Sequence, residues 1–141
     1  MSYYNQDLTQ LPQLPNTLTG LFCWNNRLTK LPEQLPNSLI HLSCENNRLT
    51  MLPDHLPNTL TTLLCWNNRL TRLPERLPNS LTWLYYGNNP FLFNWKNNLQ
   101  KWINQNITSF NNYKILVTLE SIKKNIHGYF CRDINRLCNK Y

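Results

Sequence analysis

The chain has little glycine, no long apolar run and no apolar leader, and each lack excludes a class of protein. Three glycines among 141 residues supply neither a GxGxxG nor a GxxxxGK[ST] phosphate-binding loop. No apolar stretch approaches the roughly 18 residues that cross a membrane, so no membrane span is predicted. The first residues lack a basic stretch followed by an apolar one, so no secretory signal is expected. Five cysteines without such a signal predict reduced thiols in an intracellular compartment, for which we expect the cytoplasm.

A 21-residue repeat organises the first two thirds of the chain, in which Leu and Asn are abundant. Three full copies are followed by a fourth that loses register near residue 90, and a partial copy precedes them at residues 5–15. Met1–Tyr4 would lie where the other copies place a strand. The predicted repeat region is therefore 1–91, with copies at 14–34, 35–55, 56–76 and 77–91.

Each copy has the pattern of one turn of a solenoid. Leu21 and Cys23 alternate with outward-facing residues at the period of two that a strand requires, and successive strands would pair in parallel about 4.8 Å apart. Two Leu-Pro pairs in the return half, as at Leu31-Pro32 and Leu35-Pro36, favour extended backbone over helix. One Asn after each strand is expected to hydrogen-bond backbone groups of its own and adjacent turns; these ladder residues are Asn26, Asn47, Asn68 and Asn89.

The copies match the pattern LxxLxLxxNxL, for example at Leu18, Leu21, Cys23, Asn26 and Leu28. This resembles the short leucine-rich repeats with an LPxxL signature that occur in secreted effectors of bacterial pathogens and in repeat proteins of large DNA viruses. The resemblance covers about residues 5–91. It implies a right-handed curved solenoid whose concave parallel sheet binds another protein, in the cytoplasm of a host cell if the source is such a virus or pathogen.

The residues that flank the inward Leu and Cys are expected on the concave face. Several are aromatic or apolar, and Trp and Tyr are common anchors of protein interfaces. The alternative is that they shield neighbouring strands or pack under the C-terminal segment. The predicted partner-binding residues are Phe22, Trp24, His41, Glu45, Leu64, Trp66, Trp83 and Tyr85.

Charge is unevenly distributed along the chain, whose formal net charge is +7. Residues 1–90 carry six basic and five acidic groups, so the repeat region is nearly neutral and a poor platform for nucleic acid. Arg27, Arg48 and Arg69 recur at one repeat position, where they form either a solvated edge or a contact for an acidic or phosphate-bearing partner. An acidic row at Glu33, Asp54 and Glu75 could pair with them.

The segment 92–141 is basic and has helical spacing of its apolar residues, so we expect an α-helical cap on the last turn. The alternative is a basic amphipathic helix that contacts a partner, anionic lipid or RNA. That role would fall to Lys123, Lys124, Arg132, Arg136 and Lys140.

Residues suited to catalysis are few. Cys23, Cys44 and Cys65 share a repeat position and are expected to stack in the core, so no metal site and no cofactor are predicted. Cys131-Arg132-Asp133 resembles the CxD motif of bacterial effector ubiquitin ligases, but the remaining chain is much shorter than those catalytic domains. We predict a monomeric, non-enzymatic module that binds a protein partner on the concave surface. The alternative is a ubiquitin-ligase-related effector or adaptor with its catalytic or recruiting element in the C-terminal segment.

Overall fold

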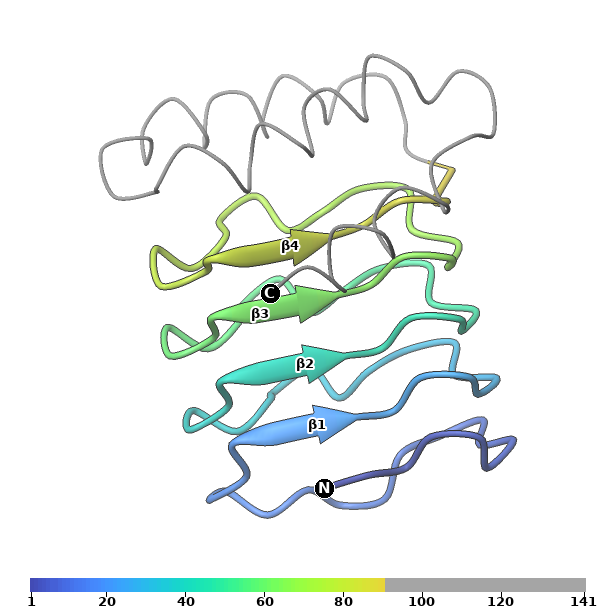
Figure 1. The fold of residues 1–141 in the computed structure, drawn as a ribbon, viewed down its shortest axis with the longest axis horizontal. Helices are drawn as coiled ribbons and strands as arrows, with labels where there is room; N and C mark the ends of the chain where they lie inside the picture. The colour runs from blue at the N-terminus through green and yellow to red at the C-terminus, as the bar shows by residue number, and fades with distance from the viewer. Residues whose placement is uncertain (91–141) are drawn as a thin grey trace, which may run out of the picture.

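The structure, a computed structural model, describes residues 1–90, which form a stack of turns around a single core. Each turn contributes one short strand: β1 (Gly20–Phe22), β2 (His41–Ser43), β3 (Thr62–Leu64) and β4 (Trp83–Tyr85). The strands pair in parallel in the order β1-β2-β3-β4 (Figure 1). The solenoid of parallel strands predicted from the repeat is therefore confirmed. The predicted helical cap lies outside the described residues.

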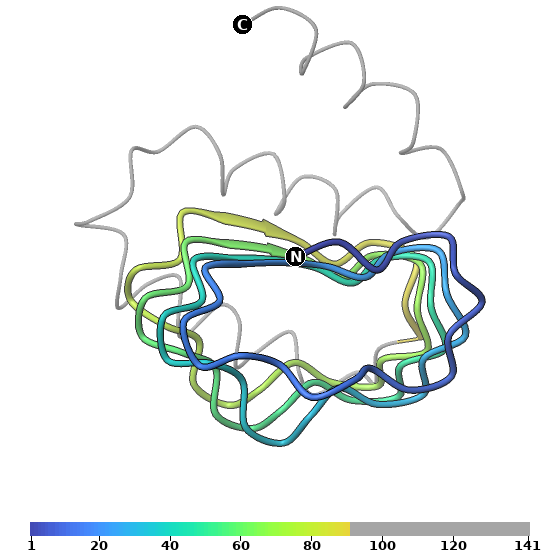
Figure 2. The same cartoon turned by 90° about the horizontal axis from the view of Figure 1, so that it is seen from below.

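The register of the sheet follows the sequence repeat. Leu21 pairs with Leu42, Leu42 with Leu63 and Leu63 with Leu84, so equivalent residues of successive copies lie side by side. Viewed along the stack, the chain traces a flattened closed coil, with the strands on one long side and the return segments on the other (Figure 2). One outward-facing repeat position therefore becomes one column of side chains across the sheet.

The core lies between the strands and the return segments and consists almost entirely of leucine. Leu21, Leu42 and Leu63 are fully buried, as are Leu28 and Leu49 after the strands. Each such side chain stabilises the fold by roughly 1.5–3 kcal/mol relative to exposure. Because its packing partners belong to the neighbouring turns, stability is shared along the stack.

The return half is extended, and a tight turn leads from it into each strand. The Pro36 carbonyl accepts a hydrogen bond from the Leu39 amide at 3.0 Å, and the same contact recurs from Leu18 to Pro15, Leu60 to Pro57 and Leu81 to Pro78. Residues 1–90 contain no helix, and therefore none that could span a membrane.

The chain leaves each strand through a residue with left-handed backbone conformation. Asn25, Asn46, Asn67 and Asn88 have φ values of 53, 53, 54 and 52°. Asn tolerates this conformation better than other residues with a Cβ, because its short side chain bonds locally. The left-handed bend therefore accounts for the first Asn of each Asn-Asn pair. The second Asn makes side-chain hydrogen bonds to its own and neighbouring turns.

Met1–Tyr3 lie beside β1 and take the place of a strand. The Met1 carbonyl accepts from the Phe22 amide at 3.1 Å, the Tyr3 amide donates to the Phe22 carbonyl at 2.7 Å, and Ser2 forms a parallel bridge with Phe22. The edge of β1 is thus paired with the first residues of the chain.

Candidate functional site

Outward-facing residues of successive turns form three columns across the sheet and the segment that follows it. We call the surface formed by these columns the strand face. The repeat resemblance implies that it is concave. The sheet register aligns the first two columns. Backbone hydrogen bonds just beyond the strands align the third, for example from the Asn46 amide to the Trp66 carbonyl at 3.1 Å. The columns are Gly20, His41, Thr62 and Trp83; Phe22, Ser43, Leu64 and Tyr85; and Trp24, Glu45, Trp66 and Gly87.

All eight residues predicted to contact a partner lie in these columns. His41 is exposed and Phe22 retains 36% of its accessible surface. The other six are half-buried: Trp24, Glu45, Leu64, Trp66, Trp83 and Tyr85. Two alternative roles were to shield neighbouring strands or to pack under the C-terminal segment, and the second concerns a part of the chain outside the described residues.

Aromatic rings on the strand face lie against one another and against the backbone. Tyr4 stacks on Trp24, with ring centroids 4.6 Å apart and planes within 6°. Trp66 and Tyr85 form a tilted pair at 5.8 Å. A Cβ atom at Gly20 would lie 3.0 Å from Cε2 of Phe22, so the absence of a side chain lets this ring lie over the strand. These contacts limit the motion of large side chains that remain partly open to solvent.

Glu45 is the acidic residue of the strand face, between Trp24 and Trp66 in the third column. Ser43 is 95% buried, and its hydroxyl donates to Oε2 of Glu45 at 2.7 Å. Burial raises the pKa of the Glu45 carboxyl above its ordinary value, and the hydrogen bond from Ser43 partly offsets this. The carboxylate is thus held in position at some cost in hydration.

The four ladder asparagines join the turns through their side-chain amides. Asn47 donates from Nδ2 to the Cys23 carbonyl of the preceding turn at 2.9 Å and to its own Cys44 carbonyl at 3.2 Å. Its Oδ1 accepts from the Leu28 amide at 3.0 Å. Asn68 and Asn89 repeat the pattern one and two turns later.

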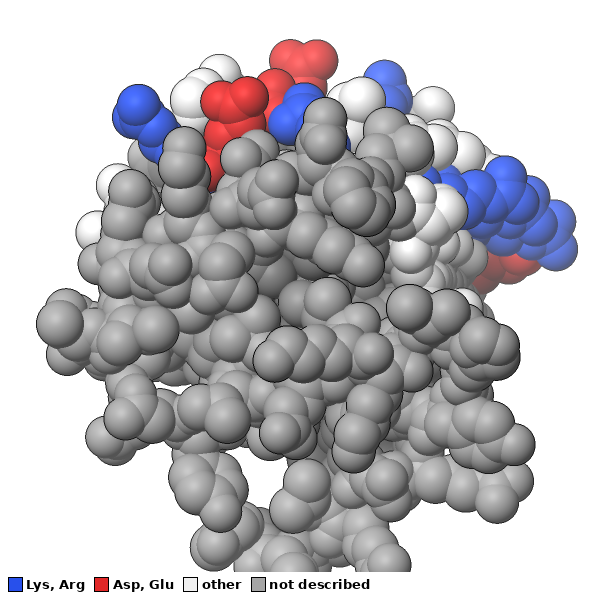
Figure 3. All heavy atoms as spheres, turned by 90° about the horizontal axis from the view of Figure 1, so that it is seen from above, with Lys and Arg blue, Asp and Glu red and all other residues white. Residues whose placement is uncertain are grey.

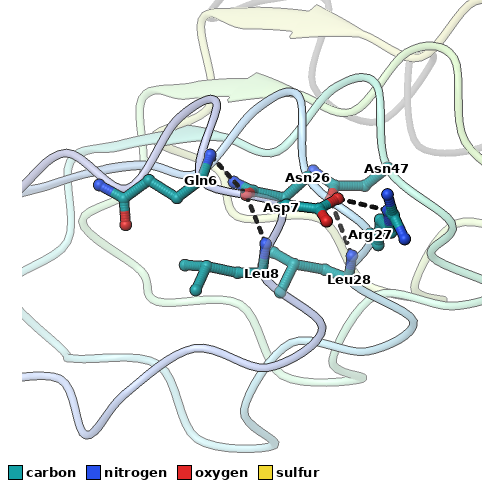
Figure 4. Close-up of polar contacts among 7 residues, drawn as sticks. All are labelled: Gln6, Asp7, Leu8, Asn26, Arg27, Leu28 and Asn47. Atoms are coloured by element: carbon teal, nitrogen blue, oxygen red, sulfur yellow. Dashed lines mark hydrogen bonds and ion pairs between the residues drawn. The ribbon is translucent and has the colours of Figure 1, made fainter.

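Asn26 makes the corresponding contacts with the N-terminal segment. Its Oδ1 accepts from the Gln6 and Leu8 amides at 3.1 and 2.9 Å, as Figure 4 shows together with the Leu28–Asn47 bond. Its Nδ2 donates to the Tyr3 carbonyl at 2.6 Å. The partial first copy is therefore bound to the stack by the same side-chain chemistry as the full copies.

A second polar ladder, on the return side, was missed by the sequence reasoning. The Thr59 hydroxyl lies 2.8 Å from the carbonyls of both Asn37 and Leu39 in the preceding turn, and Ser38 contacts Asn16 and Leu18 in the same way. Ser80 bonds the Leu60 carbonyl at 2.7 Å. The signal was present, because the position after Leu-Pro-Asn is Ser or Thr in every copy.

The charged rows pair differently from the prediction. Arg27 forms an ion pair with Asp7, which occupies the place of the arginine row in the partial first copy (Figure 4). Asp54 pairs with Arg72 at 2.9 Å and not with the arginine row. Figure 3 shows basic side chains gathered at one edge and mixed charges at another part of the visible rim. Both ion pairs are exposed, so each adds at most about 1 kcal/mol to stability.

The repeated cysteines are buried free thiols. Burial raises the pKa of the Cys23 thiol to about 12, with a smaller effect from the charge of Glu45, and it raises those of Cys44 and Cys65 as well. Protonated thiols inside a leucine core act as small apolar side chains. Within residues 1–90 no three His, Cys, Asp or Glu side chains lie close enough to hold a metal ion. The Cys131-Arg132-Asp133 motif lies beyond the described residues.

The solved structures that are similar to this chain include proteins of two bacterial pathogens. YopM from Yersinia enterocolitica shares 36% sequence identity with it at a TM-score of 0.56, over 59% of this chain. A leucine-rich repeat domain of a Shigella effector shares 35% identity at a TM-score of 0.62, over 65% of this chain. The repeat region is a leucine-rich repeat solenoid similar to those of bacterial effectors.

The likeness covers only part of each relative. The chain spans 18% of the YopM chain and 41% of the Shigella chain. No protein-family model and no curated protein sequence matches this chain. The similar solenoids support a protein-interaction scaffold in general terms.

Proposed function

We propose that this leucine-rich repeat chain is a non-enzymatic module that binds a protein partner through the strand face. The observation that carries the proposal is the concentration of partly exposed aromatic and apolar side chains there. Phe22, Trp24, Leu64, Trp66, Trp83 and Tyr85 all lie in its three columns. Large amphipathic side chains with little remaining freedom are the usual anchors of interfaces, because little conformational entropy is lost when they bind.

The opposite side of the solenoid is less suited to this role. Its outward positions carry polar and charged residues, such as Asn58 and Glu75, and one exposed Met51. Isolated apolar residues of this kind are normal on protein surfaces. The free buried thiols Cys23, Cys44 and Cys65 support an intracellular partner, since such thiols persist in reducing compartments.

Capture of partners by the tagged full chain tests the proposal. The double variant Trp66→Ala, Trp83→Ala removes two candidate anchors and should weaken binding of a captured, purified partner by at least about 30-fold, which corresponds to loss of a hot-spot contact. Met51→Ala, on the return side, is the matched control and should bind as the wild type does. Equal affinity of the double variant and the wild type would contradict the proposal.

A second variant separates loss of contact from loss of folding. Thr62→Arg places a long charged side chain at the centre of the strand face, at a half-buried position of β3. We expect it to retain the thermal unfolding midpoint of the wild type within a few degrees while it blocks the partner. A partner that binds Thr62→Arg with unchanged affinity occupies some other surface.

A further inference from the structure

The third column of the strand face places one carboxylate between two indoles. Trp24, Glu45 and Trp66 occupy equivalent positions of consecutive turns. Strand spacing of about 4.8 Å separates neighbouring members, so the two indoles are attached roughly 10 Å apart with the carboxylate midway. A flat group in contact with an aromatic ring lies about 3.5 Å from it, so the separation of roughly 10 Å lets such a group contact one of the two indoles.

The stacking of Tyr4 shows how the indole of Trp24 is oriented. The centroid distance of 4.6 Å and the near-parallel planes mean that the Tyr4 ring covers one face of the indole. Tyr4 covers the face of Trp24 directed toward the first turn. The other face is directed toward the turn that carries Glu45.

The charge of Glu45 is unbalanced within the described part of the chain. The ion pairs of residues 1–90 are Arg27–Asp7 and Arg72–Asp54, and neither involves this residue. The Ser43 hydroxyl fixes the carboxylate but brings no positive charge. A partly dehydrated carboxylate that is already oriented gains more from an incoming cation than a fully hydrated one, because much of its hydration has been lost beforehand.

We propose that the strand face receives an arginine side chain of the protein partner, with its guanidinium bound to the Glu45 carboxylate and stacked on Trp24. The planar guanidinium offers paired donors to a carboxylate and a flat face to an indole, whereas the ammonium group of lysine offers a point charge. This inference rests on the proposed function and adds the chemistry of the ligand. A defined arginine probe can test it without a captured partner.

The experiment uses the full chain and a defined probe, N-acetyl-Gly-Arg-Gly-amide, titrated while the indole Nε1–H resonances are followed by NMR. Trp24→Phe and Trp66→Phe identify the two signals. We expect saturable shifts of the Trp24 signal with a dissociation constant on the order of 10 mM, as for a single-residue contact. The lysine analogue should bind several-fold more weakly, and the citrulline analogue, which keeps the shape but not the charge, should give no saturable shift.

Glu45→Gln should weaken binding of the arginine probe at least tenfold, and Glu75→Gln, which changes an exposed acid on the return side, should leave it unchanged. Equal binding of arginine and citrulline probes, no saturable shift at Trp24, or unchanged binding by Glu45→Gln would overturn the inference. Equal binding of lysine would overturn the choice of arginine. If a captured partner is lost with Trp66→Ala, Trp83→Ala but binds Glu45→Gln normally, the arginine contact fails while the proposed function stands.

Discussion

The side-chain amide of Asn47 donates a hydrogen bond at 2.9 Å to the carbonyl of Cys23, which lies in the preceding turn of the solenoid. A buried carbonyl that faces a bend has no strand partner on that side, and the asparagine supplies one. Because the same amide also bonds its own turn, each ladder residue joins two turns at once. Cooperativity of folding between the turns of this solenoid therefore depends on polar contacts as well as on leucine packing.

Replacement of Asn47 by Ala should destabilise the whole stack. The Leu28 amide would lose its acceptor, Oδ1 of Asn47, inside the core, whereas the Cys23 and Cys44 carbonyls would keep contacts with Asn26 and Asn68. A buried donor without a partner costs about 1–3 kcal/mol, so we expect the free energy of unfolding to fall by about 2 kcal/mol. Urea denaturation measures it. Asn58→Ala, at an exposed position, should change stability by less than about 0.5 kcal/mol, and equal effects of the two would contradict the ladder's role.

The hydroxyl ladder should contribute a smaller amount. Thr59→Val keeps the shape of the side chain but removes the hydroxyl that lies 2.8 Å from the Asn37 and Leu39 carbonyls. Because the site is partly open to water, the expected loss is about 0.5–1 kcal/mol. Thr50→Val is the control, since Thr50 is exposed. A Thr59→Val protein as stable as the control would show that water replaces the lost bond without cost.

The repeated cysteines should resist alkylation while the chain is folded. Their side chains are inaccessible, and burial holds the pKa of the Cys23 thiol near 12 and raises those of the other two, so almost no thiolate exists at pH 8. Iodoacetamide at pH 8 should leave the peptides that contain Cys23, Cys44 and Cys65 unmodified, whereas the same treatment in concentrated urea modifies all three. Peptide mass spectrometry reads each position separately. Rapid labelling of Cys44 in the native chain would contradict its place in the core.

The repeat made much of the fold predictable, because a periodic sequence that forms one turn must form the next in the same way. The strands, the leucine core and the order of turns follow from positions such as Leu21 and Leu42, whose spacing allows only one parallel register. Contacts at the end of the stack did not follow, because the partial copy departs from the repeat. Asp7 stands where the other copies have arginine, so its pairing with Arg27 depends on this single exception.

The strand face was predictable only in part, for a related reason. Period-two alternation placed Trp24, Glu45 and Trp66 on one surface, but alternation does not give ring orientation. The stack of Tyr4 on Trp24 and the anchoring of Glu45 by Ser43 depend on rotamers and on neighbours in adjacent turns. Similarly, the sequence shows only that position 20 has no side chain, whereas the structure shows that Gly20 leaves room for the ring of Phe22.

Glu45 should lower the stability of the isolated chain at neutral pH, as expected of a residue retained for binding. Burial raises its pKa in the folded chain above the ordinary value of 4.5, so its contribution to stability is greatest below that value and is lost as the pH rises through the folded-state pKa. Glu45→Gln keeps an acceptor for the Ser43 hydroxyl and removes the charge. We therefore expect this variant to unfold at a higher urea concentration than the wild type at pH 7, and the difference to shrink at pH 4.

The thiols coupled to Glu45 stay protonated throughout this range and do not contribute. Glu75→Gln, at an exposed position, provides the baseline. A Glu45→Gln chain less stable than the wild type at pH 7 would mean that the carboxylate stabilises the fold, and the argument that it is kept for a cationic ligand would lose its basis.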